Sequence, residues 1–290
     1  IESMLAQSYK NIEIVLIDNA STDNGLKVAK EKLISSGVKH KIIENSINLG
    51  ICASLNLAIK AVRGAYTCII SSDDLLASGR IKRHIQILEK TNNSKFSVCN
   101  GPVRIMNKDS SLTTELRLVG NLKFNNCFNL SSIVTKKDCP TLQGCTFKTN
   151  VLRNLPFDEE LFYDDWDFFI RLIINNYNII HDKSIAAYYR SHDLGLNRKT
   201  AKMIESRNKI RLKYYDKIFK IDNKLALEFD FTIDFWNLMG LSYQGKIFIW
   251  YYALMRLIIK NPKFSSFKIR DIAWSLKNLI FYKFTKKRKN

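Results

Sequence analysis

The chain has 290 residues, of which 46% are apolar, so it is long enough for one medium domain with an appendage. Its formal net charge is +19, and residues 240–290 contribute +11 of it through twelve Lys or Arg against one acid. No recognised nucleic-acid-binding module carries this charge, so we predict no nucleic-acid partner. The six cysteines are scattered without a Cys-x-x-Cys pair, which excludes a zinc site of the usual spacing and predicts free thiols in a reducing cytoplasm.

The first predicted strand covers residues 12–17 and runs into Asp18. Turn and cap residues follow this strand and lead into a helix that we predict from about residue 23 to residue 33. A strand at 40–44 and a helix at 51–62 come next. The alternation of strands and helices predicts an α/β fold.

A further apolar strand, predicted at 66–71, is followed by the adjacent carboxylates of Asp73 and Asp74. A run rich in β-branched residues with an abrupt acidic end indicates a buried parallel strand that opens into a site at its carboxyl edge. Carboxylate oxygens of this kind suit Mg²⁺ or Mn²⁺, which also binds substrate phosphates. The alternative is a simple turn or a helix cap before Leu75.

Acidic residues therefore follow two predicted strands, at Asp18 and at Asp73–Asp74, which describes an open sheet with its ligand at that edge. The chain has no Gly-x-Gly-x-x-Gly after its first strand and no P-loop, so a dinucleotide fold and a P-loop enzyme are both disfavoured. A nucleotide held through a metal ion on its phosphates is the interpretation that remains.

A cluster of three carboxylates precedes an apolar run with helical spacing. On a helix Asp164 and Asp167 are neighbours, while Asp165 points about 100° away. Carboxylates at a helix start also suit the positive end of the helix dipole, so a capping cluster is the alternative to a functional site. The other elements predicted between residues 80 and 192 are a helix at 80–90, strands at 96–100, 143–147 and 185–190, a helix end at 175–178, and His192 after the last strand.

From residue 199 onward the pattern is helical, with a predicted break at Asn261-Pro262. Two apolar stretches rich in Trp and Tyr, 247–259 and 272–282, lie among basic residues, and a basic tail follows at 286–289. The first stretch is too short to span a bilayer, but such helices suit the surface of an anionic membrane. The alternative is a helical pair that packs on the catalytic domain and carries a solvated tail.

At this point the sequence resembles a known family, the family 2 glycosyltransferases, which have the GT-A fold and use nucleotide-sugar donors. The motifs that carry the resemblance follow the family's order over roughly residues 1–200, and no single one would suffice. They are Ser3–Ile14, Ile17–Asp23, Asn48-Leu49-Gly50, Leu55-Asn56, Ser72-Asp73-Asp74, Tyr163–Asp167, Arg171-Leu172 and Tyr189–His192.

The resemblance implies a role for each matching residue. Asp18 would accept a hydrogen bond from the uracil or thymine ring of the donor, Asp73 would face its ribose or sugar, and Asp74 would bind the metal ion. Asp165 would be the general base on the acceptor hydroxyl, and His192 would approach the metal or the diphosphate. Arg198, just past His192, is expected to reach the diphosphate, unless it is a solvated loop charge. Asp164 stands where the family usually has Glu. Asp164 and Asp167 would support the residues that contact the substrates, without touching the substrates themselves.

The function implied is inverting transfer of a sugar from a UDP- or dTDP-sugar to a glycan or lipid-linked acceptor, with Mn²⁺ or Mg²⁺ as cofactor. An in-line displacement needs one acidic site for the departing diphosphate and a separate carboxylate for the acceptor proton. We predict a GT-A domain at 1–200, a basic helical region at 201–290, and a place on the cytoplasmic face of the plasma membrane in surface polysaccharide synthesis. The rival hypothesis is a truncated or degenerate relative that binds a nucleotide or glycan without turnover.

The sequence departs from the family at its start, because Ile1 already lies inside the helix that follows the family's first strand. We therefore expect roughly 10–20 residues of the family pattern to be absent, including the first sheet strand and one wall of the base pocket.

Overall fold

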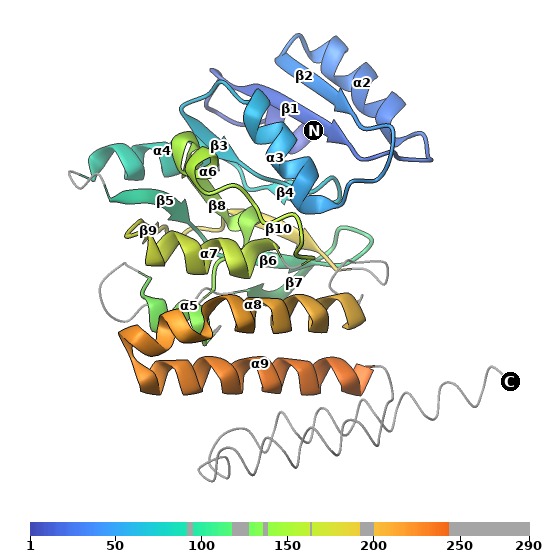
Figure 1. The fold of residues 1–290 in the computed structure, drawn as a ribbon. Helices are drawn as coiled ribbons and strands as arrows, with labels where there is room; N and C mark the ends of the chain where they lie inside the picture. Colours follow the sequence, from blue (N-terminus) through green and yellow to red (C-terminus); the bar gives the residue numbers. More distant parts are fainter. Residues whose placement is uncertain (92–94, 118–127, 136–138, 163, 192–199, 244–290) are drawn as a thin grey trace, which may run out of the picture. The chain divides into compact units, whose positions relative to one another are not determined.

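The computed structural model describes residues 1–243 except 92–94, 118–127, 136–138, 163 and 192–199, and it divides into two units, 1–192 and 193–290. The larger unit is a mixed α/β structure, and the described part of the smaller one is helical (Figure 1). No helix among the described residues combines the length and the apolar character that crossing a membrane requires. The stretches 247–259, 272–282 and 286–289 and the predicted break at Asn261-Pro262 lie outside the described residues.

The chain begins with the short helix α1 (Glu2–Leu5) and continues with β1 (Glu13–Asp18), α2 (Gly25–Ser36) and β2 (Lys39–Glu44). β1 and β2 form a parallel pair in which Glu13 lies opposite Lys39 and Asp18 opposite Glu44. α2 ends at Gly37, whose φ of +66° lies in the left-handed region that glycine enters without a steric penalty. The predicted strand–helix–strand order is confirmed here, with the helix shifted a few residues toward the carboxyl end.

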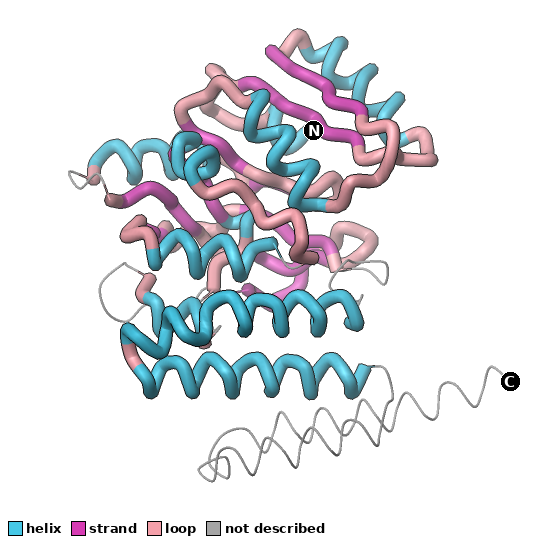
Figure 2. Tube along the Cα trace, in the orientation of Figure 1, coloured by secondary structure: helices cyan, strands magenta, loops and turns pink. Residues whose placement is uncertain are grey.

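Figure 2 shows the strands of the larger unit in magenta among cyan helices, and a second sheet among them has the strand order β3-β8-β5-β9. Its strands are β3 (Tyr66–Cys68), β5 (Phe96–Asn100), β8 (Cys145–Lys148) and β9 (Asn178–His181). β5 is parallel to β9, but β3 pairs with β8 in the antiparallel direction, with Thr67 opposite Phe147. The expectation of a parallel strand at 66–71 was therefore wrong in length and, for the pairing described, in direction. Within β3 only Thr67 is buried, so the run of β-branched and aromatic residues did not indicate a strand that is buried along its length.

A third sheet has the strand order β4-β10-β6-β7, and it places the acidic pair. Its strands are β4 (Leu75–Leu76), β6 (Val103–Met106), β7 (Leu112–Arg117) and β10 (Ala187–Arg190). β4 is a two-residue strand that pairs antiparallel with β10, and β10 also pairs in parallel with β6. Asp73 and Asp74 thus immediately precede a sheet strand, and the strand β3 that comes before them belongs to a different sheet.

Helices pack around these sheets, and the core lies where α7 (Asp164–Ile174) meets β8. Phe147 of β8 makes an edge contact with Phe168, at 5.6 Å between ring centroids, and Phe169 lies 5.5 Å from Phe168. These three rings and Trp166 are fully buried, and aromatic contacts of this kind add to the stabilisation that burial provides. The remaining helical elements of this unit are α3 (Ile51–Ala61), α4 (Arg80–Lys90), α5 (Leu130–Val134), the 3₁₀ turn η1 (Leu142–Gly144) and α6 (Thr149–Asn154).

The described part of the smaller unit is a hairpin of two long helices, α8 (Thr200–Ile221) and α9 (Asn223–Tyr243), which lie side by side in Figure 1. Asp222 caps α9, because its carboxylate accepts a hydrogen bond from the Leu225 N–H at 3.0 Å. Arg211 of α8 forms ion pairs with Asp230 and Asp234 of α9. Burial lowers the pKa of Arg207, which also bonds across the hairpin, to about 10, so its guanidinium stays charged near neutral pH. The prediction of helix after residue 199 is confirmed as far as the chain is described.

Candidate functional site

The acidic pair lies where the β4–β10 ladder ends. The last ladder positions are Leu75 opposite Tyr188, and the next residue on each strand leads to Asp74 and toward Arg190. The Asp74 carboxylate is buried, at 6% exposure, and its Oδ1 accepts a hydrogen bond from the Arg190 N–H at 2.9 Å. Asp73 is half-buried, and its carbonyl oxygen accepts a bond from Arg190 Nε at 2.9 Å. The structure thus joins the predicted metal-binding pair to the end of the strand that leads to His192.

A turn supports the same pair from the other side of the chain. The Asp74 N–H donates to the Ser71 carbonyl at 3.2 Å, which closes a tight turn over the acidic residues. Such a turn is the alternative to a metal site that the sequence left open. The structure contains this turn, and it also buries the Asp74 carboxylate, which a turn by itself does not require.

The chemistry of the acidic pair fits a hard divalent cation, since carboxylate oxygens are the groups that Mg²⁺ and Mn²⁺ prefer. Among the described residues, however, no three His, Cys, Asp or Glu side chains come close enough to hold a metal ion together. Mg²⁺ is commonly bound by one or two carboxylates together with substrate phosphates, so this finding agrees with such an arrangement. His192 and Arg198, which were predicted to complete the site, lie outside the described residues.

Asp18 ends β1 and lies half-exposed. Its carboxylate accepts a hydrogen bond from the Ser21 N–H at 3.1 Å. This bond closes a local turn in the residues that follow the strand. The neighbouring Asn19 binds the loop before α3, donating to Asn48 Oδ1 at 3.0 Å and accepting from the Leu49 N–H at 2.9 Å. The two motifs around Asp18 and around Asn48 therefore meet in space, at the carboxyl end of β1.

The cluster of carboxylates near residue 165 begins α7, as predicted. Asp165 is half-buried there, in the first turn of the helix. Asp167 is 1% exposed and pairs with Arg171 one turn later, at 2.8 Å between Oδ2 and Nε. That contact accounts for Asp167 as a helix-stabilising residue. The side chain of Asp164 lies outside the described part of the chain.

The loop before α7 is held by Asn56 of α3, a residue that the sequence analysis named only as part of a motif. Asn56 Nδ2 donates to the Phe157 carbonyl at 2.9 Å, and Asn56 Oδ1 accepts from the Phe157 N–H at 2.8 Å. Phe157 in turn stacks on Phe168 of α7, with 5.0 Å between the ring centroids. A buried amide that satisfies both backbone groups of one residue therefore fixes the approach to the helix that carries Asp165.

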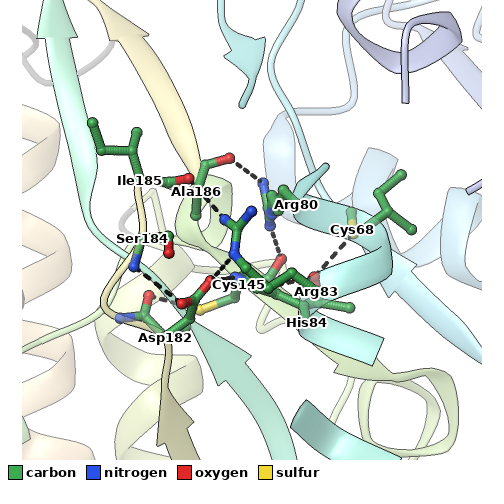
Figure 3. A network of polar contacts seen from close by, with 12 residues as sticks. Cys68, Arg80, Arg83, His84, Cys145, Asp182, Ser184, Ile185 and Ala186 are labelled. Carbon is green, nitrogen blue, oxygen red and sulfur yellow. Dashed lines mark hydrogen bonds and ion pairs between the residues drawn. The ribbon is translucent and has the colours of Figure 1, made fainter. Parts of the chain in front are cut away.

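A polar network that was not predicted from the sequence lies at the amino-terminal end of α4 (Figure 3). The fully buried Arg80 donates to the carbonyls of Gln143, Cys145 and Ala186. Arg83 Nε bonds Asp182 Oδ2 at 2.5 Å and its NH2 group bonds the Ile185 carbonyl at 3.1 Å. These contacts tie the helix that follows the acidic pair to the segment that leads into β10.

His84 belongs to the same network and is fully buried. Its Nδ1 lies 2.9 Å from Thr146 Oγ1, and its Nε2 lies 3.4 Å from Asp182 Oδ2. Burial lowers the pKa of His84 to about 4, so the ring is neutral near pH 7 and the contact with Asp182 is not an ion pair there. Burial alone would raise the pKa of Asp182, but hydrogen bonds from His84, Arg83 and the Ser184 N–H outweigh it and hold the pKa well below the usual range.

Five of the six cysteines are described, and all five are free thiols, as predicted. Cys145 approaches Asn100 Oδ1 at 3.4 Å, and Cys68 lies 3.1 Å from Thr146 Oγ1. Burial raises the pKa values of Cys99 and Cys145, so both remain protonated near neutral pH. Cys99 and Cys145 are buried in the core, and as protonated thiols they are poor nucleophiles.

Comparison with known proteins identifies the family and the fold of the chain. A model of the family described as "Glycosyl transferase family 2" matches residues 1–147, half of the chain. The chain is 40% identical over 90 residues to EpsE of Bacillus subtilis, a match that covers 31% of this chain and 32% of that protein. It is 27% identical over 179 residues to an uncharacterized glycosyltransferase of Methanocaldococcus jannaschii, covering 61% of this chain and 59% of the relative. The matches thus span less than two thirds of the length of these curated relatives.

Solved structures show the same fold at low identity. TarS of S. aureus, residues 1–349 in complex with UDP, aligns with a TM-score of 0.53 at 17% identity, over 89% of this chain and 83% of that one. The mannosyltransferase PcManGT from Pyrobaculum calidifontis, in complex with GDP-Man and Mn²⁺, aligns with a TM-score of 0.55 at 15% identity, over 95% of this chain and 73% of that one. The predicted GT-A architecture is confirmed, and the chain belongs to glycosyl transferase family 2.

Proposed function

We propose that the protein transfers a sugar, with inversion, from a UDP- or dTDP-sugar to a hydroxyl of a glycan or lipid-linked acceptor. The observation that carries the proposal is the buried carboxylate of Asp74, which is fixed by the end of β10 at the edge of the third sheet. Among proteins of this fold, one was solved with UDP and another with GDP-Man and Mn²⁺, which supports a nucleotide-sugar donor.

In this proposal Asp74 binds Mn²⁺ or Mg²⁺ and Asp73 faces the ribose or the sugar of the donor. When bound, the cation would neutralise charge that develops on the departing diphosphate. Asp18, at the end of β1, would receive a hydrogen bond from the pyrimidine ring. His192 and Arg198 remain proposed contacts of the diphosphate.

Asp165 is the proposed general base. Its place in the first turn of α7, on a helix that Trp166 anchors through a 2.9 Å bond from its Nε1 to the Ile133 carbonyl, gives it a firm support. A base must lie within hydrogen-bond reach of the acceptor hydroxyl, and orientation of both substrates in one site would supply much of the rate. The Asp167–Arg171 pair supports this helix from within, and Asp164 is proposed to do the same.

We further propose that residues 1–200 form the catalytic domain and that the basic region 201–290 associates with the anionic inner face of the plasma membrane. Support comes from the charge of +11 carried by residues 240–290. The acceptor would then be lipid-linked or belong to a surface polysaccharide such as O-antigen, capsule or lipooligosaccharide. Cosedimentation with phosphatidylglycerol vesicles, compared with neutral vesicles at two salt concentrations, would test the membrane contact.

The deciding experiment is calorimetric titration of the purified chain with UDP, dTDP and GDP, first with Mn²⁺ and then with EDTA. Metal-dependent binding of one pyrimidine diphosphate is expected and would select the donors to screen for transfer. Binding of GDP alone would overturn the choice of a pyrimidine nucleotide. Binding without turnover on any acceptor extract would favour the rival hypothesis of a non-catalytic relative, and no binding would refute a donor site in this chain.

A further inference from the structure

We propose that Arg190 is a positioning residue, which fixes the acidic turn of Asp73 and Asp74 in the geometry that the donor and its metal ion need. This inference rests on the proposed function of that turn. It assigns Arg190 no contact with the substrate. Its work is to hold the residues that make such contacts.

The β4–β10 ladder ends beside the acidic turn. An antiparallel ladder continues by exchange of backbone N–H and C=O groups between facing residues. Here the Arg190 N–H goes instead to the carboxylate of Asp74, at 2.9 Å, and the Arg190 side chain takes the Asp73 carbonyl, at 2.9 Å. One residue thus binds the backbone of Asp73 and the carboxylate of Asp74, and it satisfies groups that the interrupted ladder would leave unpaired.

The guanidinium of Arg190 also holds the turn between β6 and β7. Arg190 NH1 donates to the Lys108 carbonyl at 3.0 Å, to Ser110 Oγ at 2.8 Å and to the Asn107 carbonyl at 3.3 Å. The turn is closed by its own bonds, with the Asn107 N–H on the Ser111 carbonyl at 2.8 Å. Arg190 therefore bridges the acidic turn to a second, internally rigid turn.

The β6–β7 turn contains a residue in the left-handed conformation. Ser110 adopts a φ of +70°, a left-handed conformation that costs a residue other than glycine energy. Its hydroxyl points to Arg190, and the Asp109 carboxylate binds the Ser111 N–H and hydroxyl at 3.0 and 2.6 Å. Those bonds lower the pKa of Asp109, the Arg190 charge adding to the effect, so the carboxylate that closes the turn stays ionised. A strained turn persists where its surroundings hold it, and Arg190 is part of what holds this one.

A hollow lined by Asn107, Lys108, Asp109 and Ser191 adjoins the contacts that Arg190 makes. At the other end of β10, Arg80 and Arg83 of α4 bind the carbonyl groups of Ala186 and Ile185, just before the strand begins (Figure 3). Arg190 fastens the end at which the proposed chemistry takes place, while the buried network fastens the end in the core.

Two substitutions separate positioning from charge. Arg190→Lys keeps the positive charge but loses the planar group that reaches Asp73 and the second turn together. Arg190→Gln loses both. If Arg190 positions the acidic turn, both variants should bind UDP in the presence of Mn²⁺ about 10- to 100-fold more weakly, the range typical for residues that orient metal ligands. If the charge alone attracted the diphosphate, Arg190→Lys would bind as the unaltered protein does.

Lys108→Gln is the matched control, because it removes an exposed charge at the same hollow but leaves the Lys108 carbonyl that Arg190 binds. It should change the UDP affinity less than about 3-fold, as for a screened surface charge. The Mn²⁺ electron paramagnetic resonance spectrum of the protein with UDP gives an independent readout, which should change in both Arg190 variants and stay unchanged in the control. Thermal unfolding of each variant shows whether it is folded.

The outcomes are distinct. Weak binding by folded Arg190→Lys and Arg190→Gln, with a normal control, supports the proposal. Normal binding and a normal spectrum in Arg190→Lys overturn it and leave the proposed function intact, and so does weak binding that Lys108→Gln reproduces. If both Arg190 variants fail to fold, the residue serves stability and the proposal fails. If the unaltered protein binds no nucleoside diphosphate with Mn²⁺, the proposed function and this inference fall together.

Discussion

Two strand ends that carry predicted site residues, those at Asp74 and Asp18, are held in very different ways. Asp74 is buried and is bound by a residue 116 positions later in the chain. Asp18 is half-exposed and is bound by the N–H of a residue three positions later. The first arrangement depends on tertiary structure and the second on a local turn.

The surroundings repeat this difference. The segment after Asp74 leads to α4, whose Arg80 and His84 are buried and bind β8, and whose Arg83 binds Asp182 after β9. β1, by contrast, has β2 as its sheet partner among the described residues, and only Ile14 of its six residues is buried. We infer that the half of the site around Asp74, which would hold the metal ion and the diphosphate, is rigid. The half around Asp18, which would hold the pyrimidine ring, is more adaptable.

The largest effect is expected for the proposed base, which belongs to neither strand end. Asp165→Asn keeps the shape of the side chain but removes its ability to accept the acceptor proton, so transfer should fall about 10²- to 10⁴-fold. UDP binding with Mn²⁺ should stay within about 2-fold of the unaltered value, since a base contributes through the acceptor. Initial rates of transfer and calorimetry measure the two quantities.

Glu160→Gln provides the control, since it alters an exposed carboxylate shortly before α7. Turnover by Asp165→Asn at the rate of this control would remove Asp165 as the base and leave the comparison of Asp74 with Asp18 untouched.

The second effect tests that comparison directly. Asp74→Asn still presents an oxygen to the Arg190 N–H, so the turn should keep its shape while losing the charge that a cation needs. Metal-dependent UDP binding should weaken about 100-fold, at least as much as when a residue that only orients a ligand is lost. Asp18→Asn should weaken it about 5-fold, as expected for one hydrogen bond at a solvated position. Equal losses in the two variants would contradict the division into a rigid and an adaptable half.

The third effect concerns the buried network beneath the rigid half. His84 has a pKa of about 4 in the folded protein, below the ordinary value of 6.5, so the unfolded chain binds its proton first as the pH falls. The stability that a neutral His84 permits is therefore complete above pH 6.5 and is lost between pH 6.5 and 4. We expect about 2 kcal/mol of loss between pH 7 and pH 5 from this residue.

Denaturant unfolding at several pH values, in His84→Gln and in the exposed-site control His40→Gln, isolates this contribution. His84→Gln should flatten the pH dependence of the unfolding free energy, and His40→Gln should leave it unchanged. An unaltered slope in His84→Gln would show that groups other than His84 cause the loss of stability in this pH range.

The smallest effect sharpens the comparison of the two halves without any mutation. Amide protons of β1, such as those of Val15 and Leu16, should exchange at least about 10-fold faster than those of β5 and β8, a difference of about 1.4 kcal/mol in opening free energy. A two-stranded pair is only marginally stable by itself, whereas β8 lies between two strands. Hydrogen exchange followed by mass spectrometry measures this, and equal protection would refute an adaptable half.

Much of the fold could be predicted because the relevant signals are local. Apolar periodicity and cap residues placed the strand that ends at Asp18, the helix at 80–90 and the long helices after residue 199 close to where the structure has them. The pairing of β3 could not be predicted in this way. An apolar run of three residues is compatible with either direction, and the choice depends on β8, which lies about 80 residues later.

The candidate site divides along the same line. The acidic residues were visible in the sequence as unusual charge beside apolar runs, but the ion pair of Asp167 with Arg171 was not predicted. Arg190 and Asn56 belong to motifs of the family, but nothing in the sequence indicates what they bind, and the group around His84 carries no local signal at all. Each acts by reaching a backbone or side-chain group more than 60 residues away, which no pattern within one segment can reveal.

By itself, then, the sequence determined the order and type of most elements, the free cysteines and the acidic motifs of the family, because neighbouring residues encode propensity, periodicity and charge. Only the tertiary structure decided which strands pair, which carboxylates are buried, and which residues hold them. Burial and hydrogen-bond satisfaction depend on groups that folding brings together, and this is why Arg190, which the sequence shows only as part of a motif, becomes the residue that we propose to hold the acidic turn.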